Sequence, residues 1–170
     1  MRRSILPVVL GTLAALAWTG CGGDGSSKAE TGDAVTASTD TGARERGEAS
    51  ARGVSVKVMR SRYGEVIFDG AGRALYLFTR ERTSRSRCYG ACARAWPPFL
   101  TPARPRARTG VRSKLLGTTK RRDGRLQVTY RGHPLYYYVT DRKPGQITCQ
   151  DIAEFGGTWL VVSPSGRAVR

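Results

Sequence analysis

The chain has 170 residues, and its 29 Lys and Arg side chains outnumber its 13 Asp and Glu side chains to give a formal net charge of +16. All of that excess lies in residues 54–170, which hold 23 basic and 7 acidic side chains. The length of this part excludes more than one domain of ordinary size, and a positive field of this strength favours polyanionic partners.

The first 20 residues have the organisation of a bacterial secretory signal. Two arginines precede an apolar stretch, residues 5–18, which is shorter than the roughly 20 residues that span a bilayer. Two small residues stand directly before Cys21, and this ending resembles the lipobox of bacterial lipoproteins. We therefore expect residues 1–20 to be removed and Cys21 to carry acyl chains that anchor the protein. An ordinary secretory signal cleaved nearby would instead leave Cys21 as a thiol.

Residues 21–53 are predicted to form a disordered tether that begins at the lipidated cysteine. Gly, Ser, Thr, Ala and Glu dominate this segment, and Val35 is its only large aliphatic residue. Such a composition buries too little apolar surface to offset the entropy lost on ordering. The segment is long enough to hold a folded domain clear of a membrane surface.

The first half of the folded part opens with alternating valines over residues 53–60, which predict a strand. Two β-rich runs, residues 65–69 and 74–79, flank a glycine-containing turn and predict a hairpin. A polar loop over residues 80–87 follows and leads to a cysteine. The segment 88–96, CYGACARAW, has helical character.

Trp96 stands before two prolines, which end the predicted helix. Its ring is expected to pack in the core, with a carbohydrate-stacking platform as the functional alternative. A long basic connection over residues 101–124 is rich in Pro, Gly and Arg, and we expect it to be exposed. Leu115 and Leu116 are expected to attach this connection to the core.

The second half repeats this order. Residues 126–130 and 135–140 predict a second hairpin, residues 141–148 a polar loop, and residues 149–159 a cysteine followed by helical character and a tryptophan. Residues 158–169 then predict a closing hairpin around a Ser-Pro-Ser-Gly turn. The recurrence indicates an internal duplication.

We therefore expect one mainly β domain over residues 54–170, with one or two short helices. It is built from two tandem hairpin-plus-short-helix half-repeats, at about residues 54–100 and 124–164. In both long strands the alternate residues are bulky on each face, which predicts central strands that are covered on both sides.

Several phrases resemble the secreted-repeat lipoproteins of bacteria, a family described by a Tyr-x-[Phe/Trp/Tyr]-x-x-Asp motif. The second half matches this motif fully and the first half has Glu in place of Asp; the matching residues are Tyr76, Phe78, Glu81, Tyr136, Tyr138 and Asp141. The sequence segments CYGACARAWPPF, QVTYRGHPLYYY and EFGGTWLVVSP also resemble this family. The resemblance implies an extracytoplasmic, usually lipid-anchored protein of unknown function, and it supplies no catalytic residues.

Three cysteines remain once Cys21 is assigned to lipid, and an oxidising compartment favours a disulfide among them. Cys88 and Cys92 are one helical turn apart, so their Cα atoms lie within bridging range at about 6 Å. A bond from Cys149 to either of them would close a loop of about 60 residues and would stabilise the fold more. Both pairings stay open, as does the absence of any bridge.

The three cysteines and His133 would be a plausible set of ligands for Zn²⁺ or Cu⁺. The loose Cys-x₃-Cys spacing and the distance to the other ligands disfavour such a site, and we expect no metal. His133 precedes a proline in a hairpin turn, so we interpret it as a turn residue. Nucleotide-loop, serine-nucleophile, zinc-protease and haem-attachment motifs do not occur in the sequence, so we expect neither a cofactor nor catalysis.

Two functions from different classes follow. The first is a non-enzymatic binding or structural module, held at the cell membrane by lipid, whose basic charge meets an anionic wall polymer or an envelope protein. Nucleic acid is not expected as a partner because the chain carries an export signal. The second is a redox or metal-handling envelope lipoprotein that uses Cys88, Cys92 and Cys149. The basic charge could also serve solubility alone.

Overall fold

The computed structural model describes residues 53–170, so the signal segment, Cys21 and the tether lie outside the described residues. Within residues 53–170 strands dominate, and the prediction of a mainly β fold with one or two short helices is confirmed. In chain order the elements are β1 (Ser55–Ser61), β2 (Gly64–Asp69), β3 (Tyr76–Phe78), α2 (Ala91–Ala95), β4 (Leu100–Thr101), β5 (Arg106–Ala107), the 3-10 turn η1 (Ser113–Leu115), β6 (Leu116–Lys120), β7 (Leu126–Tyr130), β8 (His133–Pro134), β9 (Ile152–Glu154) and β10 (Gly157–Val161).

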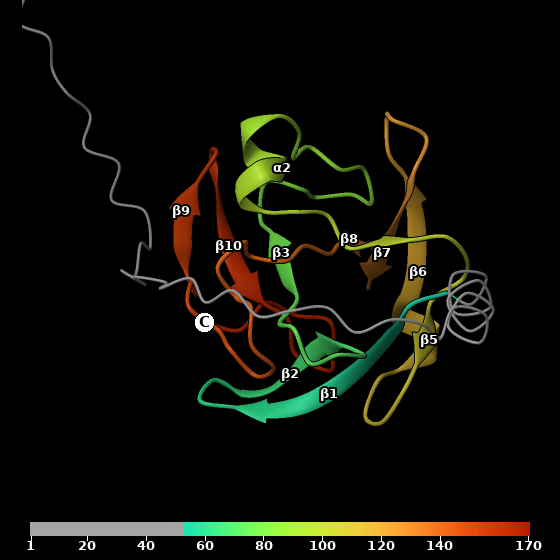
Figure 1. Cartoon of the computed structure of the whole chain (residues 1–170), viewed down its shortest axis with the longest axis vertical. Coiled ribbons are helices and arrows are strands. Elements are labelled where there is room, and N and C mark those ends of the chain that lie inside the picture. Colours follow the sequence, from blue (N-terminus) through green and yellow to red (C-terminus); the bar gives the residue numbers. More distant parts are fainter. Residues whose placement is uncertain (1–52) are drawn as a thin grey trace, which may run out of the picture. The chain divides into compact units, whose positions relative to one another are not determined.

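The strands form three small sheets, in the orders β2-β1-β5, β3-β10-β9 and β4-β7-β6, and β8 pairs with β7. Figure 1 shows β3, β9 and β10 on one side of the described part, β6 and β7 on the other, and β1 and β2 running across below them. One hydrophobic core takes residues from all three sheets, including Val56 of β1, Val128 of β7 and Leu160 of β10. The sheets are therefore held together by a shared core.

The predicted first strand is confirmed as β1, but its partner differs from the sequence prediction. β1 pairs antiparallel with β2 over their whole length, from Val56 opposite Asp69 to Ser61 opposite Gly64. The predicted hairpin between residues 65–69 and 74–79 is reduced to one isolated bridge. The reason is that β3 takes its regular pairing from β10, at the other end of the chain.

The second half begins with a hairpin that mirrors β1 and β2. β7 is the strand predicted over residues 126–130, and it pairs antiparallel with β6. The exposed connection predicted over residues 101–124 is therefore wrong for residues 116–120, which form β6. Leu115 and Leu116 pack against the core as expected.

The long strand predicted over residues 135–140 is not continuous. Tyr136 donates its N–H to the carbonyl oxygen of Tyr76, and Tyr137 donates to that of Pro97, each at 2.9 Å. Because the partner changes from one residue to the next, the segment is extended and bonded on both edges without a regular ladder. The predicted coverage on both sides is nevertheless met, since Tyr136 is fully buried.

The helical character predicted for residues 149–159 is wrong, whereas the matching segment of the first half does hold α2. Residues 152–154 form β9, which pairs antiparallel with β10. Phe155 and Gly156 join the two strands, with φ angles of 53° and 78°. Pairing with β10 satisfies the backbone of this segment and outweighs the helical propensity of Ala153 and Glu154.

Candidate functional site

Tyr76 and Tyr136 hold the same position in the two half-repeats and lie beside each other. Each residue donates its N–H to the carbonyl oxygen of the other at 2.9 Å, which forms an isolated antiparallel bridge. Both side chains are fully buried. The bridge joins equivalent residues of the two half-repeats, so it marks the centre of the duplication.

The tyrosine and the acid of the motif pair across the half-repeats. The Tyr76 hydroxyl donates to Asp141 Oδ2 at 2.5 Å, and the Tyr136 hydroxyl donates to Glu81 Oε1 at 2.6 Å. Each carboxylate is only 1% exposed. The phenol of each copy therefore binds the carboxylate of the other copy, and Glu81 fulfils the role that Asp141 has in the second copy.

The same two carboxylates also hold the polar loops that follow them. Glu81 Oε1 accepts the backbone N–H of Arg87 at 2.6 Å, and Asp141 Oδ1 accepts that of Thr148 at 2.9 Å. Each acid thus closes the loop that leads to the next cysteine. The motif links strand pairing, loop shape and contact between the copies in one hydrogen-bonded unit.

Aromatic rings complete this unit with the same crossed pattern. Trp96 and Trp159 stack on each other with their ring centroids 4.2 Å apart. Phe78 of the first copy stacks on Trp159 of the second at 4.2 Å, and Tyr138 of the second tilts over Trp96 of the first at 4.6 Å. The aromatic position of the motif therefore packs on the tryptophan of the opposite copy.

Trp96 is fully buried in this stack, and its Nε1 donates to Glu154 Oε2 at 3.0 Å. The carbohydrate-stacking alternative for Trp96 is wrong, because a platform needs an exposed ring face. All six motif residues consequently hold the two copies together.

Alkaline pH is expected to destabilise the protein through its buried phenols. Burial, reinforced by the bonded carboxylates, raises the pKa values of Tyr76, Tyr136 and Tyr137 above their ordinary value. Above about pH 10 the unfolded chain releases these protons while the folded chain keeps them, so the unfolded state binds fewer protons. The free energy of unfolding should then fall by about 1.4 kcal/mol per pH unit for each phenol.

Urea unfolding between about pH 9 and 11 measures this dependence. Tyr137→Phe should reduce the slope of the free energy of unfolding with pH by the contribution of one phenol. The Tyr137 hydroxyl is bonded to Asp69 Oδ2 at 2.9 Å. A stability that stays flat over this range would contradict the burial of the phenols.

The structure holds a disulfide between Cys88 and Cys92, with their Cα atoms 5.2 Å apart, and it leaves Cys149 as a buried thiol. No group of three or more His, Cys, Asp or Glu side chains able to hold a metal occurs among residues 53–170. The metal site considered for the three cysteines and His133 is therefore not formed in the part of the chain that the structure describes.

His133 and Tyr137 distinguish the second copy of the strand from the first, but neither forms a site. His133 belongs to β8 and is half-buried, and its Nδ1 has no hydrogen bond within residues 53–170. Tyr137 is bonded to Asp69 and lies under the guanidinium of Arg73, which is 4.0 Å from its ring centroid. This second contact is a structural cation–π pair.

A basic hollow of about 630 Å³ lies beside the loop of the first copy. Two basic runs that are far apart in the sequence meet there, one from residues 80–87 and one from the end of β6. None of its lining residues is acidic, and six of them are basic: Arg80, Arg85, Arg87, Lys120, Arg121 and Arg122. Clustered guanidinium groups are suited to phosphate and carboxylate, which they can bind through two parallel hydrogen bonds.

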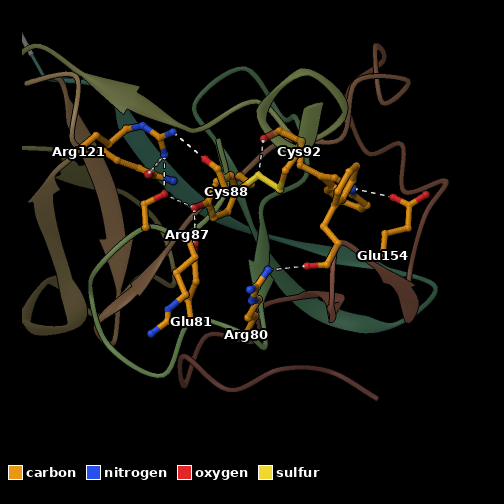
Figure 2. Close-up of a disulfide and its surroundings, with 12 residues drawn as sticks. Arg80, Glu81, Arg87, Cys88, Cys92, Arg121 and Glu154 are labelled. Atoms are coloured by element: carbon orange, nitrogen blue, oxygen red, sulfur yellow. Dashed lines mark hydrogen bonds between the residues drawn. A yellow bond between two sulfur atoms is a disulfide. The ribbon is translucent and has the colours of Figure 1, made fainter. Parts of the chain in front are cut away.

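Arg121 sets this hollow apart from an ordinary charged surface, because its side chain is only 1% exposed. Its Nη1 donates to Ser86 Oγ at 2.7 Å and its Nη2 donates to the Cys88 carbonyl at 2.8 Å, beside the disulfide (Figure 2). Its Nε has no hydrogen bond within the described residues, and an Asp123 oxygen lies 3.8 Å away. The Asp123 carboxylate and the hydrogen bonds from the Nη atoms together offset the cost of burying the Arg121 cation.

The hollow is joined to the centre of the duplication by hydrogen bonds. Ser86 Oγ contacts the Tyr136 hydroxyl at 2.7 Å, and Tyr136 in turn donates to Glu81. Burial raises the pKa of Glu81 above its ordinary value, although bonds from the Arg87 N–H and the Tyr136 hydroxyl oppose the shift. The motif of the first copy therefore supports the wall of the hollow.

The second copy presents a different surface at the equivalent loop. Its loop, residues 141–148, borders a smaller hollow of about 240 Å³, which is lined by Ser61, Arg62, Gly145 and Ile147. The two copies share a scaffold, and two basic runs, residues 80–87 and 120–122, meet at the hollow of the first copy. Sequence reasoning missed this, although the runs RERTSRSR and KRR were visible, because it treated the charge as a property of the whole domain.

A comparison with protein families gives two matches to one family, which is described as a secreted repeat of unknown function. The matches cover residues 57–99 and 117–163, which together make up more than half of the chain. The chain belongs to this family, as its motifs suggested, and the tandem half-repeats are confirmed. Comparisons with curated proteins and with solved structures gave no match.

Membership of a secreted family indicates an extracytoplasmic location. Among residues 53–170, no helix is both long enough and apolar enough to cross a membrane.

Proposed function

We propose that this protein is a non-enzymatic binding module at the cell envelope, and that its basic hollow binds an anionic polymer. The single observation that carries the proposal is the convergence of six basic side chains on one hollow whose lining includes no acidic residue. Side chains that only kept the domain soluble would have no reason to converge on one hollow.

The proposal includes attachment to the membrane through acyl chains on Cys21. The lipobox-like ending before Cys21 and the polar composition of residues 21–53 support it. A tethered domain can reach polymer chains that lie above the membrane surface. Export also keeps the domain away from intracellular nucleic acid, so nucleic acid is not proposed as the ligand.

Catalysis is not proposed because the candidate groups already have structural roles. Glu81 and Asp141 are buried and bonded to the motif tyrosines. The redox alternative would use the disulfide, but Cys88 is fully buried and Cys92 is 7% exposed. Limited access of this kind is typical of a structural disulfide, since exchange requires attack on a sulfur atom.

The proposal predicts that Arg85→Ala, Arg87→Ala and Arg122→Ala, combined in one variant, weaken binding to an anionic polymer. These side chains are exposed and line the hollow. Loss of three exposed charge contacts, each worth about 0.5–1 kcal/mol, should lower the affinity at low salt by about 10- to 100-fold. Retention on immobilised poly(glycerol phosphate) at rising salt concentrations measures the effect, and wild-type retention should fall as salt rises.

A variant of equal charge provides the control. Arg104, Arg106 and Arg108 are also exposed and lie outside the hollow, so their replacement by alanine removes the same three charges. The control should keep most of the wild-type retention. If both variants lose retention equally, the net charge binds the polymer and the hollow does not; if the wild type is not retained at low salt, the proposed function fails.

A further inference from the structure

A second hollow of about 560 Å³ adjoins the basic hollow and shares Arg80, Arg87 and Tyr89 with it. Its remaining walls are mostly apolar and come from β3, α2 and the turn between β9 and β10. They are Phe78, Ala91, Cys92, Phe155 and Gly156. The shared residues thus stand at a junction between a strongly cationic hollow and a second hollow that includes aromatic side chains.

The turn that carries Phe155 has an unusual composition. Glu154 and Gly157 pair directly, so Phe155 and Gly156 are the two central residues of the turn, both with positive φ. Turns of this type favour Asn, Asp or Gly at the first central position, and a bulky aromatic residue is strained there. Arg80 holds the turn through a bond from Nη1 to the Phe155 carbonyl at 3.1 Å.

We propose that the ligand is a phosphate-bearing carbohydrate, with its phosphate among the arginines and a sugar ring in the second hollow against Phe155. This inference rests on the proposed function and names the ligand class of the same site. A small inorganic anion would fill only part of the basic hollow. A bare polyanion would leave the aromatic hollow unused.

The chemistry of the junction supports this assignment. Arg80 and Arg87 can reach toward a phosphate from the boundary that both hollows share. An aromatic ring offers an apolar face to the C–H groups of a sugar, while the sugar hydroxyls stay available to water. A strained Phe155 is explained if its ring contributes to binding, because strain of this kind persists where the surroundings or the function require it.

The test compares two soluble forms of poly(glycerol phosphate), one bare and one carrying hexose on its glycerol hydroxyls. Calorimetric titration of the full chain at low salt gives both affinities. The glycosylated form should bind about three- to tenfold more tightly, in line with one aromatic contact. Equal affinities would overturn the inference and leave the proposed function standing, whereas absence of binding by both forms would remove the proposed function itself.

Phe155→Asn separates the loss of the ring from misfolding, because Asn suits a turn position with φ near 53°. The melting temperature should stay the same or rise. The variant should bind the two polymers equally, at the affinity that the wild type has for the bare form. A variant that still prefers the glycosylated polymer would overturn the assignment of the sugar to the second hollow.

Discussion

Trp159→Ala is expected to lower the free energy of unfolding by about 3–5 kcal/mol, and the melting temperature by more than about 10 °C. Trp159 is fully buried and contributes to both halves of the aromatic stack. Its ring stacks on Phe78 and on Trp96, each at 4.2 Å between centroids, and meets Tyr136 edge to face at 5.2 Å.

The large effect has two causes. Removal of the indole leaves a cavity between the half-repeats, bordered by the rings of Phe78, Trp96 and Tyr136. Each lost aromatic pair is also worth about 0.5–1.5 kcal/mol beyond the buried area. Chemical unfolding monitored by circular dichroism measures the change.

Val139→Ala is the matched control, because Val139 is 42% exposed although it belongs to the same extended segment as Tyr136. Its replacement should change stability by no more than about 0.5 kcal/mol. A small effect of Trp159→Ala would show that the aromatic stack does not join the two copies.

The sequence was sufficient to predict the class of the fold and the identity of the repeating unit. Period-two alternation and turn chemistry revealed β1 and β7, because these signals are local. The predicted closing hairpin is reduced to β10 and one isolated bridge between Val162 and Ala168. The repeated order of strand, loop, cysteine and tryptophan revealed the duplication. β6 was missed because Pro, Gly and Arg around it suggested an irregular connection.

The crossed pairing of the motif could not be predicted in this way. Tyr76 and Asp141 are 65 positions apart, and nothing in their spacing distinguishes a bond within one copy from a bond between copies. β9 was missed for a related reason, since its partner β10 overrides a local preference for helix.

The basic hollow was also outside the reach of sequence reasoning. It depends on the path of the loop over residues 80–87 and on the burial of Arg121, which bonds to Ser86 and Gln127. Composition reveals how many arginines are present, whereas the fold decides which of them converge. The total charge therefore suggested an anionic partner without locating the hollow that we propose as its binding site.

The central claim is that only the loop of the first copy carries the binding site. The most direct test removes two exposed charges from each of the two loops in turn and compares the affinities. Arg85→Ala with Arg87→Ala removes two exposed charges from the loop of the first copy. Arg142→Ala with Lys143→Ala removes two exposed charges from the loop of the second copy. Both variants should melt like the wild type, because surface substitutions of this kind change stability by about 0.5 kcal/mol or less.

The measurement is the dissociation constant of each variant for soluble poly(glycerol phosphate) at one fixed low salt concentration. The first-copy variant should bind about tenfold more weakly than the wild type, through the loss of two charge contacts of about 0.5–1 kcal/mol each. The second-copy variant should bind within about twofold of the wild type, since its charges lie away from the hollow. Equal losses in the two variants would contradict a site confined to the first copy.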